Sequence, residues 1–393
     1  MMKKTILVIG LLISLLDLSA AKSVFFRQAI FEPQPKHAHA SSLVELANGD
    51  LLACWFFGSG ERTANDVKIM GSRLKKGRDQ WAPVFEMADT PDLPDCNPVL
   101  FLNDGKLFLF WIIVYENKWQ NSLIACKTSR DFLDEGAPKW GDETLLRLAP
   151  GEEFKRTLEK GFREIRETTQ WDPVWAEYAR PYDEQLIAAA GDEKKTAMGW
   201  MTRIHPCKLS SGRILLPLYS DGFNIGLMAI SDDGGDSWRP SHPIVGLGLN
   251  QPSVVEKKDG TLVAYMRNDG ETQRIPMSTS ADRGETWSTA VDTDLPNPGA
   301  SIEVMVLRNG DWLLIFNDTT DRRNRLSAAL SDDEGQTWKW KRAIVDSESH
   351  SYTYPSVIQS VDGMIRLTFS CAENGLETID YVYFNPDWIK DSR

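Results

Sequence analysis

The chain has 393 residues, of which 42% are hydrophobic, and its formal net charge at pH 7 is −12. A chain of this length and composition can bury a large core, either as two domains or as one repeating unit. The acidic balance argues against a nucleic acid or an anionic membrane as the partner, so an anionic ligand would need a local basic cluster.

The first 21 residues have the pattern of a secretory signal peptide. Lys3 and Lys4 precede an apolar run at 6–16 that is too short to cross a bilayer, and small residues at 19–21 offer a cleavage point. We therefore expect the mature protein to be secreted or periplasmic in a bacterium. After cleavage we expect no membrane span.

The five cysteines and five histidines are scattered along the chain. The cysteines form no CxxC motif, and small buried hydrophobes are the expected role for them. Only His37 and His39 share a strand face, which is too little to predict a metal site. We therefore expect neither a cofactor nor a metal, and the oligomeric state stays open.

One pattern recurs six times: an apolar run, a turn that ends in glycine, and a second apolar run. Asn-Gly or Asp-Gly between β-rich runs indicates a hairpin, because the turn needs a positive φ. The spacing is about 50 residues apart from one double-length gap, and repeats of this period are typical of propeller blades. The turn glycines are Gly49, Gly105, Gly212, Gly260, Gly310 and Gly363.

A second motif, S-x-D-x-G-x-T/S-W, follows three of these hairpins. It occupies 231–238, 280–287 and 331–338, and degenerate versions end at Trp81 and Trp140. The Asp can accept bonds from turn amides, the Gly allows an open backbone angle, and the Trp can pack between blades. With these Asp-box (BNR) repeats the chain resembles the bacterial sialidase (neuraminidase) superfamily, as a sialidase-like member with a divergent active site.

The expected fold is all-β, a single six-bladed propeller over 22–393. Residues 151–195 fill the double-length gap, and their composition and three- to four-residue apolar spacing predict a helical insertion between the second and third blades. The last blade has room for three C-terminal strands, so we expect residues 24–31 to supply its fourth strand and close the ring.

The helical insertion precedes an inner strand that starts at the expected active face. It is therefore predicted to form part of the pocket rim, with Trp171, Trp175 or Arg180 as sugar contacts. A solvated helical flap is the alternative.

Strand reversal places the Asp-boxes and the hairpin turns at one end of the blades. Residues that begin a first strand or end a second strand should then meet around the axis at the other end. Converging polar groups at a concave centre indicate a binding site. Counting from the turn glycines places the following residues there: His39, Asp95 with Cys96, Arg203, Gln251, Ser301, Tyr354, Tyr219, Arg267 and Asn317.

The resemblance implies a retaining glycosidase with a Tyr nucleophile, an acid that activates it, an Asp acid/base and three arginines that clamp a carboxylate. In GERTANDVKIMGSR the matching acid/base is Asp66. In TYPSVIQ the matching nucleophile is Tyr354, with Tyr352 as a competitor. The triad arginines correspond to Arg267 in VAYMRNDG and to Arg323 in RRNRLSAALSDDEG, where Arg323 fits better than Arg322 or Arg325.

Two positions depart from the family pattern. His39 stands where the first triad arginine is expected, and Gln251 stands where the activating acid is expected. A glutamine cannot accept the tyrosine proton, so Glu303, which begins the inner strand of the fifth blade, is the candidate substitute. Arg203 and Arg62 are the candidates for a third cation.

Three functions remain open for this constellation. The first is an exo-acting glycoside hydrolase of the exo-α-sialidase type, which releases a terminal acidic sugar (sialic acid or a uronic-acid-containing glycan) from a glycan or glycoconjugate. The second is a polysaccharide lyase or non-sialidase hydrolase with His39 as general base, because imidazole titrates near neutrality. The third is a carbohydrate-binding propeller without catalysis, which Gln251 favours.

Overall fold

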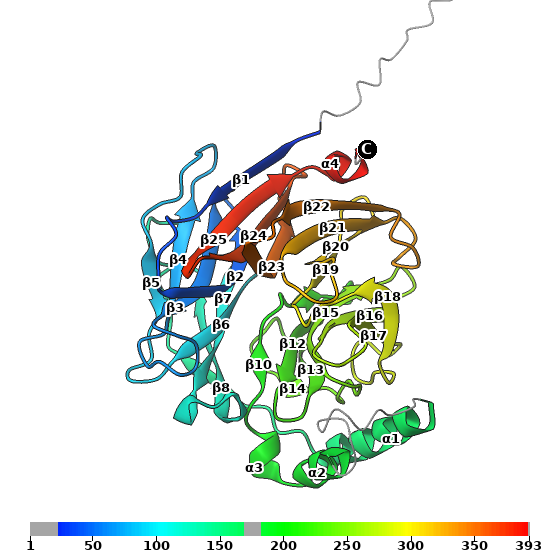
Figure 1. The fold of residues 1–393 in the computed structure, drawn as a ribbon. Coiled ribbons are helices and arrows are strands. Elements are labelled where there is room, and N and C mark those ends of the chain that lie inside the picture. The colour runs from blue at the N-terminus through cyan, green and yellow to red at the C-terminus, as the bar shows by residue number, and fades with distance from the viewer. Residues whose placement is uncertain (1–22, 169–181, 392–393) are drawn as a thin grey trace, which may run out of the picture.

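The computed structural model describes residues 23–168 and 182–391, and in it six antiparallel sheets surround one axis as the blades of a propeller (Figure 1). The prediction of a six-bladed all-β propeller is confirmed. The described part contains no helix long and apolar enough to cross a membrane. The N-terminal pattern at 1–21 lies outside the described residues.

Each blade is numbered in chain order, with its innermost strand first. Blades 1 to 3 consist of β2 (His37–Glu45), β3 (Leu51–Gly58), β4 (Lys68–Leu74) and β5 (Phe85–Ala88); β6 (Asp95–Asn103), β7 (Lys106–Val114), β8 (Ser122–Ser129) and β9 (Thr144–Leu146); and β10 (Met201–Thr202) with β11 (Cys207–Lys208), β12 (Ile214–Ser220), β13 (Ile225–Ser231) and β14 (Arg239–Pro240).

Blades 4 to 6 repeat this order. They consist of β15 (Leu249–Glu256), β16 (Leu262–Asn268), β17 (Arg274–Ser280) and β18 (Val291–Pro296); β19 (Glu303–Val306), β20 (Trp312–Asn317), β21 (Arg325–Ser331) and β22 (Trp340–Asp346); and β23 (His350–Gln359), β24 (Ile365–Glu373), β25 (Leu376–Phe384) and β1 (Phe25–Ala29).

The N-terminal strand closes the ring, as predicted. β1 pairs antiparallel with β25, with Phe25 opposite Phe384. The pairing is reinforced by Arg27, whose Nη2 lies 2.6 Å from Asp380 Oδ2. The last blade is therefore built from both ends of the described chain, and a short helix, α4 (Pro386–Lys390), follows it.

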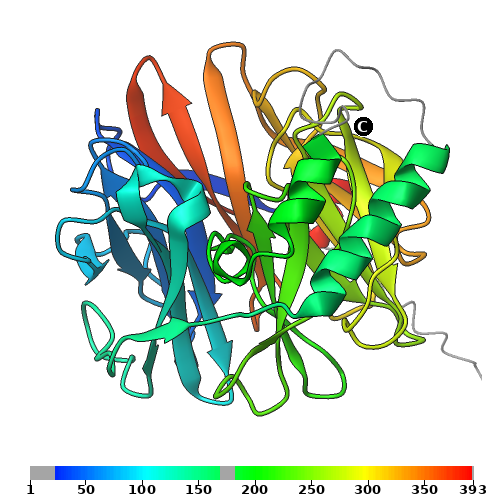
Figure 2. The ribbon, with the colours of Figure 1, turned by 90° about the horizontal axis from the view of Figure 1, so that it is seen from below.

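The helical insertion also lies where it was predicted, between blades 2 and 3. It contains α1 (Glu152–Thr168), α2 (Tyr182–Ala189) and α3 (Glu193–Thr196). α1 runs along the outside of the propeller (Figure 2), and Gly161 lets it approach closely, because a Cβ there would lie 2.6 Å from Val245 Cβ. Trp171, Trp175 and Arg180 lie outside the described residues.

Four of the inner strands carry a bulge close to the end that faces the predicted site. At each bulge the register with the second strand shifts, and one residue adopts a left-handed backbone conformation with φ between 51° and 54°. A bulge re-aims the side chains beside it. The left-handed residues are Ala40, Asn97, Gln251 and Tyr354.

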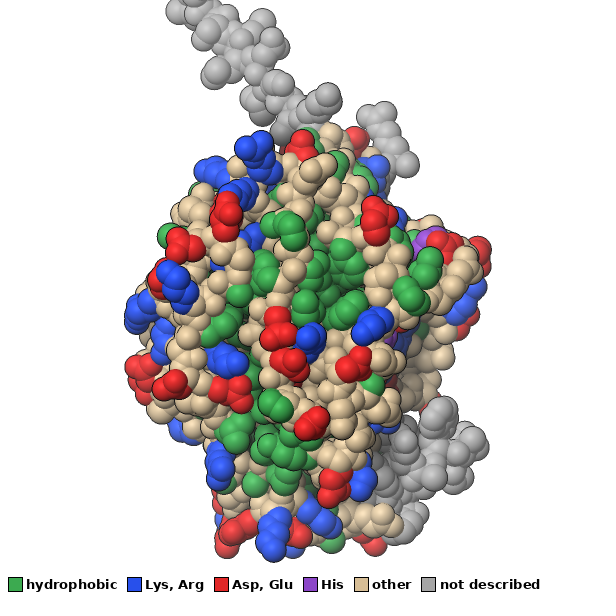
Figure 3. Space-filling model, turned by 90° about the vertical axis from the view of Figure 1, so that its left-hand side faces the viewer, with side chains coloured by type: hydrophobic (Ala, Val, Ile, Leu, Met, Phe, Trp, Pro, Cys, Tyr) green, Lys and Arg blue, Asp and Glu red, His purple; other side chains and the backbone are tan. Residues whose placement is uncertain are grey.

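The outer side of the molecule that faces the viewer in Figure 3 carries acidic and basic side chains intermixed. Hydrophobic side chains gather at the middle of this side, and charged ones surround them. On this side there is thus no continuous basic surface of the kind that binds a nucleic acid backbone.

Candidate active site

Tyr354 lies at the centre of the site, on the bulge of β23. Its hydroxyl accepts a hydrogen bond from Arg267 Nη1 at 3.2 Å. The edge of its ring meets His39, with 4.3 Å between centroids, and Arg203 Cζ lies 4.7 Å from the ring centroid. Two cations and an imidazole therefore surround the phenol that was predicted as the nucleophile. Tyr352, its competitor, is 2% exposed and stacks on His350 instead.

Arg267 and Arg323 place two guanidinium groups beside this phenol. Arg267 lies at the end of β16, and its Nε and Nη2 both bond Asp269 Oδ1, at 2.8 and 2.7 Å. Arg323, in the loop before β21, donates from Nη2 to the Gly299 carbonyl at 2.5 Å. Burial and the charge of Arg267 lower the pKa of Arg323. Two like charges held this close would be stabilised by a shared anion, and guanidinium groups suit a carboxylate.

The two candidates for a third cation differ in their surroundings. Arg203 is 2% exposed and donates to the carbonyls of Ser41 and Pro355, at 3.3 and 3.0 Å. It therefore supports Tyr354 from within the propeller. Arg62 is only partly buried, with its Cζ 5.2 Å from the Trp119 ring, and its charge acts on nearby carboxyl groups. Of the two, Arg62 is the better placed for an external ligand.

The structure does not bring Asp66 to Tyr354. The Asp66 side chain is 45% exposed, and it accepts hydrogen bonds from Ser59 Oγ and N, at 2.6 and 2.9 Å, and from Lys36 at 3.4 Å. The bonds from Ser59 lower the pKa of Asp66. A general acid at neutral pH needs a raised pKa. The acid/base role of Asp66 stays a prediction to which this geometry gives no support.

Asp221 was not predicted from the sequence, but it has the raised pKa that Asp66 lacks. It follows β12 directly, is partly buried, and burial raises its pKa to about 6 although the charge of Arg267 opposes this. A carboxyl group of this kind carries its proton close to neutrality and can act as an acid. Asp221 corresponds to Asp269 of the next blade, because each is the first residue after its second strand. Extending the count that found Tyr219 by two residues would have found it.

Neither Gln251 nor Glu303 hydrogen-bonds Tyr354 in the described part of the chain. Gln251 is 1% exposed, and its Oε1 is buried without a hydrogen-bond partner among the described residues. Glu303 accepts a bond from the Val357 amide at 2.8 Å, and its Oε1 lies 2.6 Å from His205 Nδ1. Glu303 and His205 border a cavity of about 700 Å³ towards the hairpin end of the axis. Among the described residues, no carboxylate bonds the Tyr354 hydroxyl.

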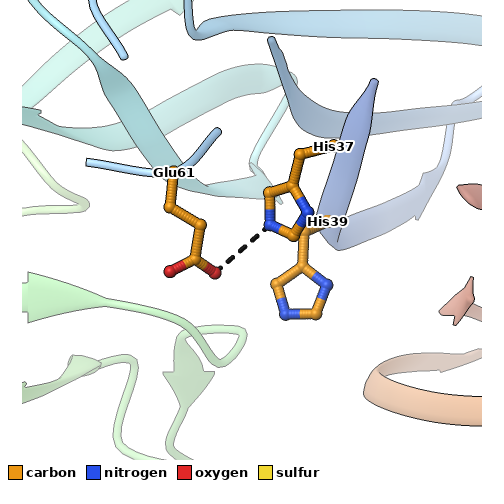
Figure 4. A group of neighbouring side chains, drawn as sticks. All are labelled: His37, His39 and Glu61. Carbon is orange, nitrogen blue, oxygen red and sulfur yellow. Dashed lines mark hydrogen bonds and ion pairs between the residues drawn. The ribbon is translucent and has the colours of Figure 1, made fainter. Parts of the chain in front are cut away.

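His39 was predicted to face the axis, but the left-handed residue of its strand is Ala40. The axis-facing position thus lies one residue later than predicted. The His39 ring still reaches Tyr354. Burial, together with the charges of His37 and Arg203, lowers the pKa of His39 well below its usual range, which keeps the imidazole neutral. Figure 4 shows His39 under His37, with the Glu61 carboxylate facing the His37 ring.

The same one-residue shift corrects the prediction for blade 2. Asn97, at the bulge of β6, donates from Nδ2 to the Tyr219 hydroxyl at 3.1 Å, on the site side. Asp95 is fully buried and accepts bonds from the Thr90 amide at 2.7 Å and from Trp111 Nε1 at 2.9 Å. Asp95 therefore stabilises its own blade and does not line the site.

The Asp-box turns lie away from this site, at the hairpin end of the blades. In the box at 231–238, Asp233 accepts bonds from the Ser237 amide at 2.9 Å and from the hydroxyls of Ser231 and Ser237. In the box at 331–338, Gly335 has φ +81° and packs against Trp312 and Tyr265. The boxes thus hold turns and neighbouring strands together.

The six blades, the Asp-box turns and the Tyr-centred cationic site define a propeller of the sialidase type. The chain belongs to the BNR repeat-like domain family, which matches residues 49–159 and 184–367. The resemblance to the sialidase superfamily is thereby confirmed.

Curated relatives support the same class over part of the chain. The chain is 30% identical over 200 residues to the anhydrosialidase of Macrobdella decora, a match that covers 44% of this chain and 26% of the relative. It is 26% identical over 169 residues to the sialidase of Micromonospora viridifaciens, covering 40% of this chain and 25% of the relative. The matches thus span about a quarter of the length of these relatives.

Among solved structures, the NanB sialidase from Streptococcus pneumoniae superposes with a TM-score of 0.66 at 14% identity. The superposition covers 92% of this chain and 71% of that chain. At this identity the likeness concerns the fold alone.

Proposed function

We propose that this protein is a sialidase-type glycosidase that releases a terminal acidic sugar, sialic acid or a uronic acid, from a glycan or glycoconjugate. The observation that carries the proposal is Arg267, which donates to the Tyr354 hydroxyl at 3.2 Å, with Arg323 near enough for the charges of the two arginines to act on one another. Two guanidinium groups at one point recognise a carboxylate by charge-assisted, bidentate bonds.

The residues around the arginines supply the other parts of a hydrolysis. Tyr354 is the nucleophile. His39 contacts the Tyr354 ring and would act as base for the phenol proton once its neutral imidazole turns a nitrogen towards the hydroxyl. Asp221 is the candidate acid for the leaving oxygen, in place of Asp66, because its carboxyl group still carries a proton near pH 6.

A β-elimination is the second candidate, favoured by the same neutral His39 and by the Tyr354 hydroxyl, which no carboxylate of the described residues contacts. In a lyase, arginines neutralise the uronate carboxylate, a base removes the proton next to it and an acid protonates the leaving oxygen. The product keeps a double bond that absorbs in the ultraviolet. A non-sialidase hydrolase with His39 as base would yield a saturated product instead.

The experiment offers the purified protein a panel of sialyl- and uronate-terminated oligosaccharides and follows the products by mass spectrometry and ultraviolet absorption. We expect a free saturated acidic sugar from wild type, and a strong loss of turnover in Arg267→Ala and Tyr354→Phe. Arg325→Ala is the matched control, because Arg325 is exposed and pairs with Asp346 at 2.7 Å. An unsaturated product would move the assignment to a lyase. Binding without chemical change across the panel would refute an enzyme and leave a carbohydrate-binding propeller.

A secreted or periplasmic location is also part of this proposal. It is supported by the signal-peptide pattern at 1–21, which would place the protein where extracellular glycans are met. N-terminal sequencing of the protein from the periplasm or medium of a bacterial host should find a chain that starts near residue 22. An intact N-terminus on protein found only in the cytoplasm would contradict it.

A further inference from the structure

Two imidazoles and one carboxylate meet at the axis end of blade 1 (Figure 4). We propose that His37, His39 and Glu61 form a binding site for a divalent transition-metal ion of the zinc class. One ligand atom from each residue lies within 4.8 Å of the others. The proposal concerns ion binding, and it limits the proposed function in one way: a His39 nitrogen that binds an ion cannot also accept a proton.

The spacing of the ligand atoms is close to that of a metal site. With Zn–N and Zn–O bonds of about 2.0–2.2 Å, two ligand atoms of a tetrahedral ion lie roughly 3.3–3.5 Å apart. His37 Nε2 and Glu61 Oε1 are separated by 3.2 Å. Since all three atoms lie within 4.8 Å of one another, His39 needs to approach by at most about 1.5 Å to complete the set.

A further carboxylate orients His37 in the way that metal-bound histidines are oriented. Glu377 lies on the opposite side of the ring, 3.0 Å from His37 Nδ1, and accepts a bond from the Ala38 amide at 3.0 Å. A carboxylate bonded to one ring nitrogen fixes the tautomer and turns the other nitrogen towards an ion. The nitrogen that remains, Nε2, is hydrogen-bonded to Glu61 at 3.2 Å, so an ion would enter in place of the proton that joins them.

His39 also suits the role of a ligand. Among residues 23–168 and 182–391, neither of its ring nitrogens has a hydrogen-bond partner, although the ring is packed between His37, Phe56 and Tyr354. A polar ring so enclosed usually bonds something. The strand pairing already sets His37 and His39 side by side, because they lie opposite Gly58 and Phe56 on β3.

The donor set determines the class of ion. Two imidazoles with one carboxylate suit Zn²⁺ and neighbouring transition metals, whereas Ca²⁺ and Mg²⁺ prefer oxygen ligands only. Arg62 and Arg267 lie near Glu61, and Arg203 and Arg323 also act on His39. Their charge opposes a cation, and the carboxylates of Glu61 and Glu377 counter it. The site leaves coordination positions open, which is typical of ions that also bind a small molecule.

The test uses Co²⁺ as a spectroscopic probe and Zn²⁺ as its competitor, with full-length protein first treated with a chelator. We expect one equivalent of Co²⁺ to bind with visible absorption bands, and one equivalent of Zn²⁺ to abolish them. His39→Ala and Glu61→Gln should lose at least tenfold in affinity. Glu377→Gln should lose about 10- to 100-fold, as orienting partners of metal ligands do.

His350→Ala is the matched control. His350 also pairs with a glutamate, with its Nε2 2.6 Å from Glu373, and its side chain is 26% exposed against 22% for His37. No third ligand joins that pair among the described residues. Binding should therefore be unchanged in this variant. A folded wild type, checked by circular dichroism, that binds neither ion, or equal binding by wild type and His39→Ala, would overturn the proposal.

Discussion

Replacing Asp221 by asparagine should make the protein more stable and less active. Burial raises the pKa of the Asp221 carboxyl from an ordinary 3.8 to about 6. At 1.36 kcal/mol per pH unit, this difference corresponds to about 3 kcal/mol by which the ionised carboxylate destabilises the fold. Above pH 6 the group is ionised in both the folded and unfolded states, so the full cost is present there. Below pH 3.8 it is absent. Asparagine removes the cost at every pH.

The assay is urea denaturation of wild type and Asp221→Asn at pH 7.5 and at pH 5. We expect the variant to gain up to about 3 kcal/mol in free energy of unfolding at pH 7.5 and about half of that at pH 5. Turnover of the acidic sugar should fall strongly, because the proton donor is lost. A variant no more stable than wild type at pH 7.5 would refute the reasoning from burial.

Asp66→Asn provides a control of opposite sign. Hydrogen bonds from Ser59 lower the pKa of Asp66. The ionised carboxylate therefore stabilises the fold at a pH above the ordinary pKa of an aspartate, and this stabilisation is lost as the pH falls through the lowered pKa. Its replacement should cost stability at pH 7.5 and progressively less in acid. The two variants thus separate a buried carboxyl from an exposed one.

Three other substitutions test the site and the packing of α1. Arg267→Lys keeps the charge but loses the two-pronged guanidinium group. A lost hydrogen bond to a charged group costs about 1.5–3 kcal/mol, so kcat/KM should fall about 10- to 100-fold. An unchanged kcat/KM would exclude a bidentate contact with the substrate carboxylate. Tyr354→Phe should abolish turnover while calorimetry still detects binding of the acidic sugar. Gly161→Ala should lower the free energy of unfolding by about 1–3 kcal/mol, and with it the thermal midpoint, because the added Cβ meets Val245. Gly151→Ala, where a Cβ meets nothing within 4 Å, should not.

The blades could be predicted from the sequence because their signals are local. A turn glycine such as Gly260 has φ +86° in the structure, and only a few residue types accept that conformation. The strand that closes the ring could be predicted by counting strands, because the last blade lacked one and residues 24–31 belonged to no other blade. Both inferences need no knowledge of which side chains meet.

The site was predicted only to within one residue. Counting from glycines assumes a regular strand, but the bulges insert a residue, so Ala40 and Asn97 occupy positions assigned to their neighbours. Asp66 and Asp221 could not be ranked, because the pKa of Asp221 depends on burial and on Arg267 from another blade, and that of Asp66 on bonds from Ser59 that the sequence does not reveal.

The pairing of β1 with β25 also dictates the order in which the molecule can be completed. Arg27 and Asp380 are 353 positions apart, and closing a loop of that length costs about 5 kcal/mol of chain entropy beyond a constant. During synthesis, β24 stays an unpaired edge until residues 376–384 have left the ribosome, and β1 must wait with it. A chain that ends before residue 376 therefore leaves β24 as an exposed edge of its sheet. Once β25 and β1 have paired, β1 is the outer edge of the blade instead.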